Sequence, residues 1–174
     1  MAGDFNGDHK TDIAIVNHDA NAGWHTIPLA LSTGNGAFTV SNQESGSFAF
    51  WASGSRSNPV LGDFNGDGRL DIALINNDPN SGWFTIPVAF GHTNGIFTVT
   101  NSGVPNFPAW SRDPDARAIA EDLNADGKTD IALTGGRSWN FIPTARSNGD
   151  GTFTVTNPTS GAFADATKFS VIIF

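Results

Sequence analysis

The stretch DFNGDGRLD, at residues 63–71, decides how this chain of 174 residues folds. Two further versions stand 59 residues to either side, DFNGDHKTD at residues 4–12 and DLNADGKTD at residues 122–130. In all three versions, oxygen-bearing side chains occupy positions 1, 3, 5 and 9 of the loop. A fixed interval of this length is the sequence signature of a repeat architecture, in which each repeat is one supersecondary unit.

The spacing of these oxygens predicts a calcium site in each loop. Carboxylate, amide and carbonyl oxygens at alternate positions wrap a short loop around a hard cation, for which Ca²⁺ is the obvious candidate. We expect three Ca²⁺ per chain in a structural role, each held by four side chains and the backbone carbonyl at position 7. The expected ligands are Asp4, Asn6, Asp8, Lys10 and Asp12; Asp63, Asn65, Asp67, Arg69 and Asp71; and Asp122, Asn124, Asp126, Lys128 and Asp130. The alternative, in which Asp and Asn only cap their own turns, is disfavoured by the identical spacing in three copies.

One loop departs from the others at position 6. Gly68 and Gly127 occupy this position in the second and third loops, whereas the first loop has His9. Glycine permits a sharp turn with positive φ, which histidine tolerates less well. The first site is therefore predicted to be the weakest of the three.

The composition supports metal loops and excludes several classes of partner. The net charge is −8, and nine of the 17 acidic residues are loop aspartates, so three Ca²⁺ would bring the charge to about −2. Clustered Lys and Arg are absent, which argues against nucleic acid. There is no cysteine, and no apolar run approaches the length of a membrane span. The first residues lead directly into the first loop, so we expect no signal peptide within this chain.

Each loop opens the same series of short strands. An apolar run such as residues 72–75 comes first, then a run that begins with Trp and contains Pro, then an Asn-Gly turn, then a Phe-Thr-Val strand. These patterns predict antiparallel hairpins, and no sustained helical period accompanies them. Since proline cannot donate to a ladder, the second strand should carry a bulge or an unpaired stretch at Pro28, Pro87 and Pro143.

The unit is four strands in about 59 residues, which is the size of one propeller blade. We therefore predict an all-β protein, a β-propeller with three four-stranded blades in a single repeat domain, residues 1–174. The blade repeats are placed at about 3–61, 62–120 and 121–174, with the C-terminal strand 169–174 completing a blade. Three blades are too few for a closed propeller, so a six-bladed ring formed by a homodimer is favoured. The alternative is a single chain forming an open or three-unit closed solenoid.

The motifs Gly62-Asp63-Phe64-Asn65-Gly66-Asp67-Gly68 and Gly3-Asp4-Phe5-Asn6-Gly7-Asp8 resemble those of the FG-GAP/VCBS repeat family. The third copy, residues 121–127, is looser but keeps every ligand. This family includes calcium-binding blades of integrin α-chain propellers and of fungal and bacterial propeller lectins. The resemblance implies blades, calcium and an extracellular, secreted setting. It does not fix a ligand, because the same blades occur in adhesins, toxins and secreted enzymes.

Aromatic residues carry the remaining recognition chemistry. Trp faces stack on the apolar faces of sugars, and pockets repeated from blade to blade would give avidity. Because they lie in irregular, polar segments, the residues expected to bind carbohydrate are Trp51, Arg56, Trp110 and Arg112. The Trp residues that open the second strands are expected instead to fill the gaps between blades, namely Trp24, Trp83 and Trp139.

Binding is therefore favoured over catalysis. The four histidines do not recur as a set, and neither a cysteine nucleophile nor a Gly-x-Ser-x-Gly elbow is present. We predict a calcium-stabilised, lectin-like module that binds glycans. The alternative is a structural or protein-adhesion module without sugar affinity, such as a segment of a longer or engineered propeller.

Overall fold

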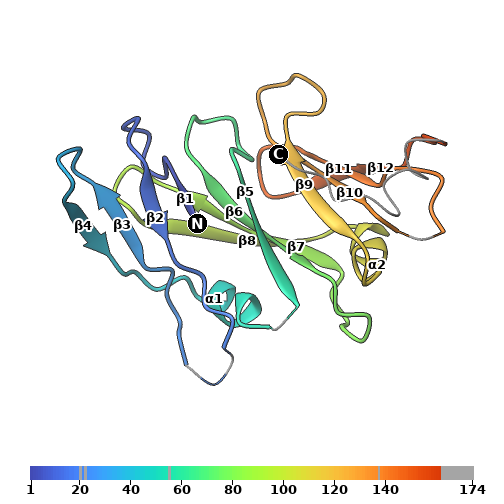
Figure 1. The fold of residues 1–174 in the computed structure, drawn as a ribbon, viewed down its shortest axis with the longest axis horizontal. Coiled ribbons are helices and arrows are strands. Elements are labelled where there is room, and N and C mark those ends of the chain that lie inside the picture. Colours follow the sequence, from blue (N-terminus) through green and yellow to red (C-terminus); the bar gives the residue numbers. More distant parts are fainter. Residues whose placement is uncertain (20, 22, 55, 137, 162–174) are drawn as a thin grey trace.

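The computed structural model describes residues 1–19, 21, 23–54, 56–136 and 138–161, which form three four-stranded antiparallel sheets and two short helices. The first sheet contains β1 (Ala2–Gly3), β2 (Asp12–Ala14), β3 (Leu29–Ser32) and β4 (Phe38–Ser41). The second contains β5 (Ser57–Gly62), β6 (Asp71–Asn76), β7 (Thr85–Gly91) and β8 (Phe97–Gly103). The third contains β9 (Arg117–Glu121), β10 (Asp130–Thr134), β11 (Thr144–Ser147) and β12 (Phe153–Thr156). The helices, α1 (Ser47–Ala52) and α2 (Phe107–Ser111), link one sheet to the next (Figure 1).

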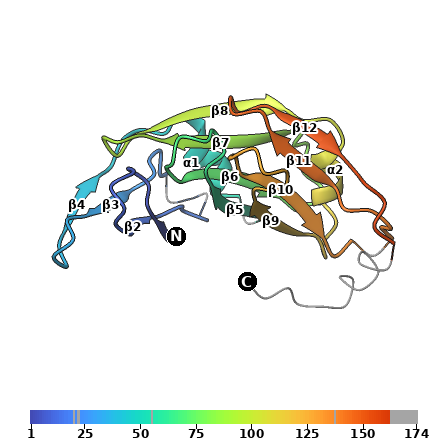
Figure 2. The same ribbon diagram turned by 90° about the horizontal axis from the view of Figure 1, so that it is seen from above.

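The sheets are the predicted blades. Strands within each sheet follow chain order, as expected for hairpins and meanders (Figure 1). Seen from above, the three sheets follow one another around an open arc, with β5 and β9 on its concave side (Figure 2). We refer to the sheets as blades 1, 2 and 3. The predicted all-β propeller architecture is confirmed. The single chain forms an open arc, as one form of the alternative expected, rather than a three-unit closed solenoid, and the six-bladed homodimer stays a prediction.

Each sheet begins one strand before the acidic loop that opens the corresponding sequence repeat. The strand before each loop pairs with the strand after it, as in the register Gly62 to Asp71 of β5 and β6. Each blade therefore begins before its loop. In blade 1 this first strand has two residues, whereas β5 has six. The predicted C-terminal strand 169–174 lies outside the described residues.

Proline ends the central ladder of every blade, as predicted. The β6–β7 pairing contains only two register pairs, and the second joins Ala73 to Val88, next to Pro87. The same two-pair ladder stops beside Pro28 in blade 1 and beside Pro143 in blade 3. Since the ladder stops there, the Trp-led runs become strands only after their proline or close to it.

The hydrophobic core lies between blades rather than within them. Along β6, Ile72 and Leu74 pack into the cluster shared with blade 1, while Ala73 and Ile75 pack into the cluster shared with blade 3. Successive side chains of a strand point to opposite faces. A strand buried on both faces therefore reads as a continuous apolar run, which is what the repeat shows.

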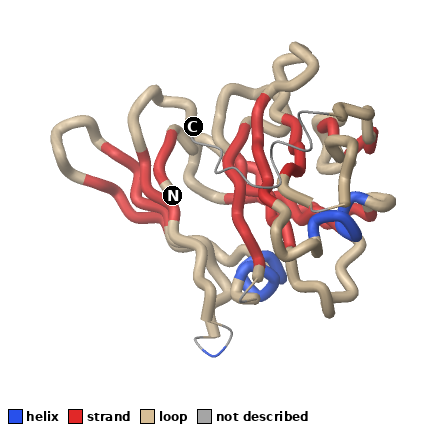
Figure 3. Tube along the Cα trace, turned by 45° about the vertical axis from the view of Figure 1, so that its right-hand side comes forward, coloured by secondary structure: helices blue, strands red, loops and turns tan. Residues whose placement is uncertain are grey.

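The topology separates two ends of the molecule. The acidic loops join β1 to β2, β5 to β6 and β9 to β10, so all three lie at one end. The opposite end carries the loops between the second and third strands of each blade and both helices (Figure 3). We call these the loop end and the helix end. Neither helix in the described part of the chain is long and apolar enough to span a membrane.

The close fit between blades predicts a strong effect at Gly62. A Cβ atom there would overlap the Thr129 side chain of the next blade, so Gly62→Ala should lower the free energy of unfolding by about 1–3 kcal/mol. Gly103→Ala is the matched control, because that Cβ would meet nothing within 4 Å. Denaturant unfolding measures both. Equal effects at the two glycines would contradict the inter-blade fit, and Thr129→Ala should partly restore the Gly62→Ala variant.

Candidate metal loops and aromatic pocket

The first aspartate of each acidic loop organises its backbone. In the second loop, Asp63 Oδ1 accepts the amides of Gly66 (2.7 Å) and Asp67 (3.0 Å), and its Oδ2 accepts the amide of Gly68 (2.7 Å). The Asn65 side-chain oxygen accepts the Asp67 amide as well. These bonds pull the chain into a tight coil around the carboxylate. The Asp and Asn side chains therefore cap their own turns, which the sequence analysis gave as the alternative to a metal site. This capping is compatible with metal binding by the same loops.

Two loop positions adopt left-handed backbone, and only one was expected. At position 6, His9 has φ 62°, where the other loops have glycine, as the sequence predicted. Position 4 is also left-handed, with Gly7 and Gly66 in the first two loops and Ala125 (φ 60°) in the third. An L-residue in this region costs roughly 1–2 kcal/mol. The first and third loops therefore each carry one strained residue, and the second carries none.

The aspartate at position 9 is fully buried in all three loops, at Asp12, Asp71 and Asp130. In the second loop its oxygens accept the amides of Phe64 (2.9 Å) and Gly91 (2.9 Å). Burial, with the nearby Asp67 and Asp63 carboxylates, raises the pKa of Asp71 to about 7 despite these bonds.

In the third loop, the pKa of the position-9 aspartate is shifted in the same direction. Burial raises the pKa of Asp130, and the Asp126 and Asp122 carboxylates add to the effect. Oδ2 of Asp130 is buried without a well-aligned hydrogen bond in the described part of the chain, although the nearby Leu123 amide lowers the pKa of this carboxylate. A poorly paired buried acceptor is costly, and a bound cation would satisfy it.

The side chain at position 7 pairs with the carboxylate at position 5, a contact that the sequence analysis did not identify. The pairs are Lys10 with Asp8 (2.7 Å), Arg69 with Asp67, and Lys128 with Asp126 (3.0 Å). Hydrogen bonds from the lysine side chains hold the pKa of Asp8 and of Asp126 below the ordinary value. A cation that used position 5 would compete with these side chains.

The carboxylate, amide and carbonyl oxygens of each loop are of the kind that Ca²⁺ prefers, but the carboxylates do not point toward a common centre. Among the described residues, no group of three or more Asp, Glu or His side chains is gathered closely enough to hold a metal. The position-5 carboxylates turn toward position 7, and those at position 1 toward backbone amides. The donors that fit best are the buried position-9 aspartates, above all Asp130, whose Oδ2 lacks a well-aligned hydrogen bond.

At the helix end, Trp51 of α1 lines an aromatic pocket together with residues of blade 2, and Arg112 contacts two of those residues. The pocket has a volume of about 240 Å³ and is lined by Trp51, Trp83, Phe84, Thr85, Asn101, Gly82 and Pro87. Arg112 Nη2 donates to the Trp83 carbonyl (2.6 Å), and its guanidinium lies 5.4 Å from the Phe84 ring centroid. Phe84 is 70% exposed. We call this cavity the Trp51 pocket.

The equivalent position between blades 2 and 3 is filled. Phe141 stands where blade 2 has Thr85, and its ring lies 5.4 Å from that of Trp110 and 5.9 Å from that of Trp139. Trp139 is 7% exposed, so the gap is closed by three packed rings. Trp110, one of the predicted ligand-binding residues, is therefore packed against other rings between blades 2 and 3. A comparison of Thr85 with Phe141 in the repeats is the sequence signal that could have shown this.

Arg56 does not join the Trp51 pocket. Its side chain is exposed, while its backbone carbonyl accepts the Asn77 amide (3.0 Å). The Trp residues expected to fill gaps differ among themselves. Trp139 is buried, Trp83 is half-buried, and Trp24, in blade 1, is 40% exposed.

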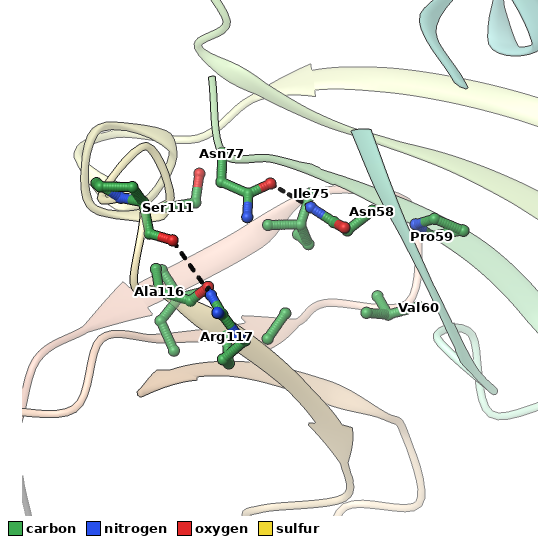
Figure 4. Close-up of a pocket in the computed structure, with 11 residues that line it drawn as sticks. Asn58, Pro59, Val60, Ile75, Asn77, Ser111, Ala116 and Arg117 are labelled. Carbon is green, nitrogen blue, oxygen red and sulfur yellow. Dashed lines mark hydrogen bonds between the residues drawn. The ribbon is translucent and has the colours of Figure 1, made fainter. Parts of the chain in front are cut away.

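A second cavity, of about 410 Å³, lies between β5 and β9 (Figure 4). Its polar groups are engaged with one another. Asn58 donates to Asn77, Ser111 donates to the Asn76 carbonyl (2.7 Å), and Arg117 donates to the Ala116 carbonyl (2.8 Å). No aromatic side chain lines it. For a ligand that stacks on aromatic rings, the Trp51 pocket is the better candidate.

Replacing the two left-handed loop residues that are not glycine by glycine should stabilise the protein. His9→Gly and Ala125→Gly should each raise the free energy of unfolding by about 0.5–1 kcal/mol, because glycine adopts φ near 60° without a Cβ clash. His18→Gly is the control, since His18 is exposed without positive φ and should lose a few tenths of a kcal/mol. Thermal unfolding of the calcium-free protein measures all three. Losses at positions 9 and 125 equal to the control would contradict the assigned strain.

Comparison with known proteins agrees with the fold and the repeat. Residues 4–74 match the model of the FG-GAP-like repeat. No curated protein sequence matches the chain. Among solved structures, a lectin from Agrocybe aegerita, described for its specific recognition of non-reducing terminal N-acetylglucosamine, superimposes with a TM-score of 0.67 at 20% identity. The match covers 98% of this chain and 41% of the lectin chain. With the three acidic loops and the three four-stranded blades, these matches show a β-propeller fold in which residues 4–74 carry an FG-GAP-like repeat.

Proposed function

We propose that this protein is a calcium-stabilised binding module that recognises carbohydrate through the Trp51 pocket. The observation that carries the proposal is the pocket itself, an open, aromatic-lined cavity beside a polar amide, on a propeller whose fold matches that of a lectin. Ligand sites of this kind are concave, mostly apolar and carry few polar groups. The terminal N-acetylglucosamine that the matching lectin recognises is the first sugar to test.

The pocket suits one sugar ring. Its volume of about 240 Å³ admits a single ring rather than an extended chain. Trp51 and Phe84 offer flat apolar faces, and Asn101 and Thr85 offer hydrogen-bonding groups to hydroxyls or an acetamide. Arg112 fixes the wall, because it holds the Trp83 carbonyl and covers the Phe84 ring at once.

Calcium is proposed as a structural ion in each acidic loop. The position-9 aspartates Asp12, Asp71 and Asp130 would hold it together with oxygens from positions 1, 3, 5 and 7. The ion would neutralise the charge of the buried position-9 carboxylates. It would also rigidify the acidic loops, which hydrogen-bond from one blade to the next. We further propose an extracellular setting and no catalytic activity. The competing function, a protein-adhesion module, becomes the conclusion if no glycan binds.

Calcium should raise the melting temperature and EDTA should lower it, more at pH 8 than at pH 5. The pKa of Asp71 is raised from 3.8 to about 7 in the metal-free protein, so below pH 7 a proton competes with the ion. Without metal, this carboxyl favours the folded state below pH 3.8, and that contribution is lost as the pH rises through 7. Affinity should therefore weaken roughly ten- to hundredfold from pH 8 to pH 5.

Isothermal titration with CaCl₂ at both pH values measures the affinity, and differential scanning calorimetry measures the melting temperature. Asp71→Asn is the informative variant, because it removes the titrating group and should flatten the pH dependence of the second site. A melting temperature unaffected by calcium and by EDTA at pH 8 would exclude the proposed role.

The Trp51 pocket is tested by closing it. Thr85→Phe copies the ring that fills the equivalent position of blade 3, so it should abolish glycan binding without unfolding the protein. Trp51→Ala should weaken binding roughly tenfold or more, because it removes a stacking face. Phe50→Ala is the control, since this neighbouring ring is 66% exposed and lies outside the pocket.

A glycan array followed by titration of the binding sugar reads out all three variants. Full affinity in Thr85→Phe would show that sugar binds elsewhere. The absence of any glycan hit with the folded, calcium-loaded protein would favour the adhesion module instead.

A further inference from the structure

Each acidic loop carries a positive charge of its own. Position 7 is lysine or arginine in every copy, at Lys10, Arg69 and Lys128, and we call these side chains the loop cations. The ammonium groups of the two lysines lie 2.7 Å and 3.0 Å from the position-5 carboxylate of their loops, and Arg69 pairs with Asp67. Single ion pairs near a surface are often incidental. Recurrence at the same place in three loops makes this pair a feature of the repeat.

The pairing occupies both oxygens of the position-5 carboxylate. In the second loop, the Arg69 amide donates to Asp67 Oδ1 (3.0 Å), and the Arg69 guanidinium donates to Oδ2. In the third loop, Lys128 donates to Asp126 from its amide (2.9 Å) and holds Oδ2 with its ammonium group. The first loop is built in the same way. Position 5 can therefore turn toward a metal only after Oδ2 has lost the loop cation.

The stems of the loop cations lie on the loop of the preceding blade. A Cβ atom added at Gly7 would lie 3.2 Å from Cγ of Arg69, and one added at Gly66 would lie 3.2 Å from Cγ of Lys128. Both glycines occupy position 4 of the preceding loop. These contacts join consecutive blades inside the described chain. The loop cations are therefore placed by packing between blades as well as by charge.

Arg69 is held more firmly than Lys128. Its Nε donates to the Gly91 carbonyl (3.0 Å) while its Nη2 donates to Asp67, so two of its nitrogens are anchored. Lys128 is held by Asp126 through its one ammonium group. The two side chains are almost equally covered, at 20% and 23% exposed, so the difference lies in the bonds rather than in burial. An ammonium group is also the more strongly hydrated of the two ions, which favours its release into water.

We propose that the loop cations are internal counter-ions, which leave the position-5 carboxylate when Ca²⁺ binds, and that Arg69 makes the second loop harder to fill than the third. The inference rests on the proposed calcium role and adds an order of filling to it. In the metal-free protein, the loop cation offsets the charge of position 5 and keeps the loop coiled. Release of Arg69 breaks one more charge-assisted hydrogen bond than release of Lys128. The second loop should therefore bind Ca²⁺ roughly tenfold more weakly than the third.

Calcium titration of the isotope-labelled protein, followed by NMR, tests the order of filling. The amides of Gly68 and Gly127 report on single loops, because each donates to the position-1 aspartate of its own loop (2.7 Å and 2.9 Å). We expect the Gly127 signal to reach its midpoint at a roughly tenfold lower Ca²⁺ concentration than the Gly68 signal. Coincident midpoints, or the reverse order, would overturn the proposal.

Substitutions of the loop cation test the cause of that order. Arg69→Met keeps an apolar stem and removes the charge, so the midpoint of Gly68 should fall roughly tenfold while that of Gly127 stays the same. Arg69→Lys should bring the two midpoints together. Arg56→Met is the matched control, because it removes the same charge from an exposed side chain at the helix end. A shift of equal size in this control would mean that net charge sets the affinity, and would overturn the proposal.

Thermal unfolding supplies a readout without metal. In EDTA, Arg69→Met should melt below the wild-type protein, because it has lost its counter-ion. In saturating calcium the two should melt alike, since the wild-type side chain is then released as well. An equal deficit under both conditions would show that Arg69 stays paired and would overturn the inference.

The same titration separates this inference from the calcium proposal beneath it. If neither glycine signal of the wild-type protein responds to calcium, both are wrong. If both signals respond but Arg69→Met leaves the Gly68 midpoint unchanged, the calcium role stands and the counter-ion role is wrong.

Discussion

Burial between neighbouring blades is the constraint on which the rest of the structure depends. A single blade has two apolar faces and cannot hide either of them alone, as the two-sided packing of Ile72 and Ile75 on β6 shows. The acidic loops serve this constraint directly, because the Leu70 amide of one loop bonds the Asp4 carbonyl of the loop before it. A change in the backbone of one acidic loop should therefore also alter the packing between its blade and the neighbouring blade.

Much of the fold could be predicted from the sequence because each blade is short and the loop recurs at a fixed interval. The ligand spacing located the loops, and the prolines located the ends of the central ladders. The short helices could not be predicted, since six and five residues are too few to show a helical period. The left-handed backbone at Ala125 was missed although Gly7 and Gly66 occupy the same loop position. That alignment contained the signal.

The candidate binding site was harder to predict for a physical reason. Trp51 and Arg112 were chosen from their polar surroundings. Trp51 lines the pocket and Arg112 contacts Trp83 and Phe84 in its wall, but the wall residues other than Trp51 come from a different repeat than Trp51. The pocket joins Trp51 to residues about 30 to 50 positions further along the chain, and only a superposition of repeats shows whether such a gap between blades is open. With Thr85 the pocket beside Trp51 stays open, whereas Phe141 at the equivalent position fills the gap beside Trp110. A single side chain therefore decides which repeat offers a cavity.

The separation of the loop end from the helix end has a consequence for how calcium and a ligand would influence each other. The acidic loops lie at one end of the blades and the Trp51 pocket at the other, so a ligand in the pocket would not touch a loop. Removal of calcium would therefore act on ligand binding only through the packing of the blades that separate the two ends.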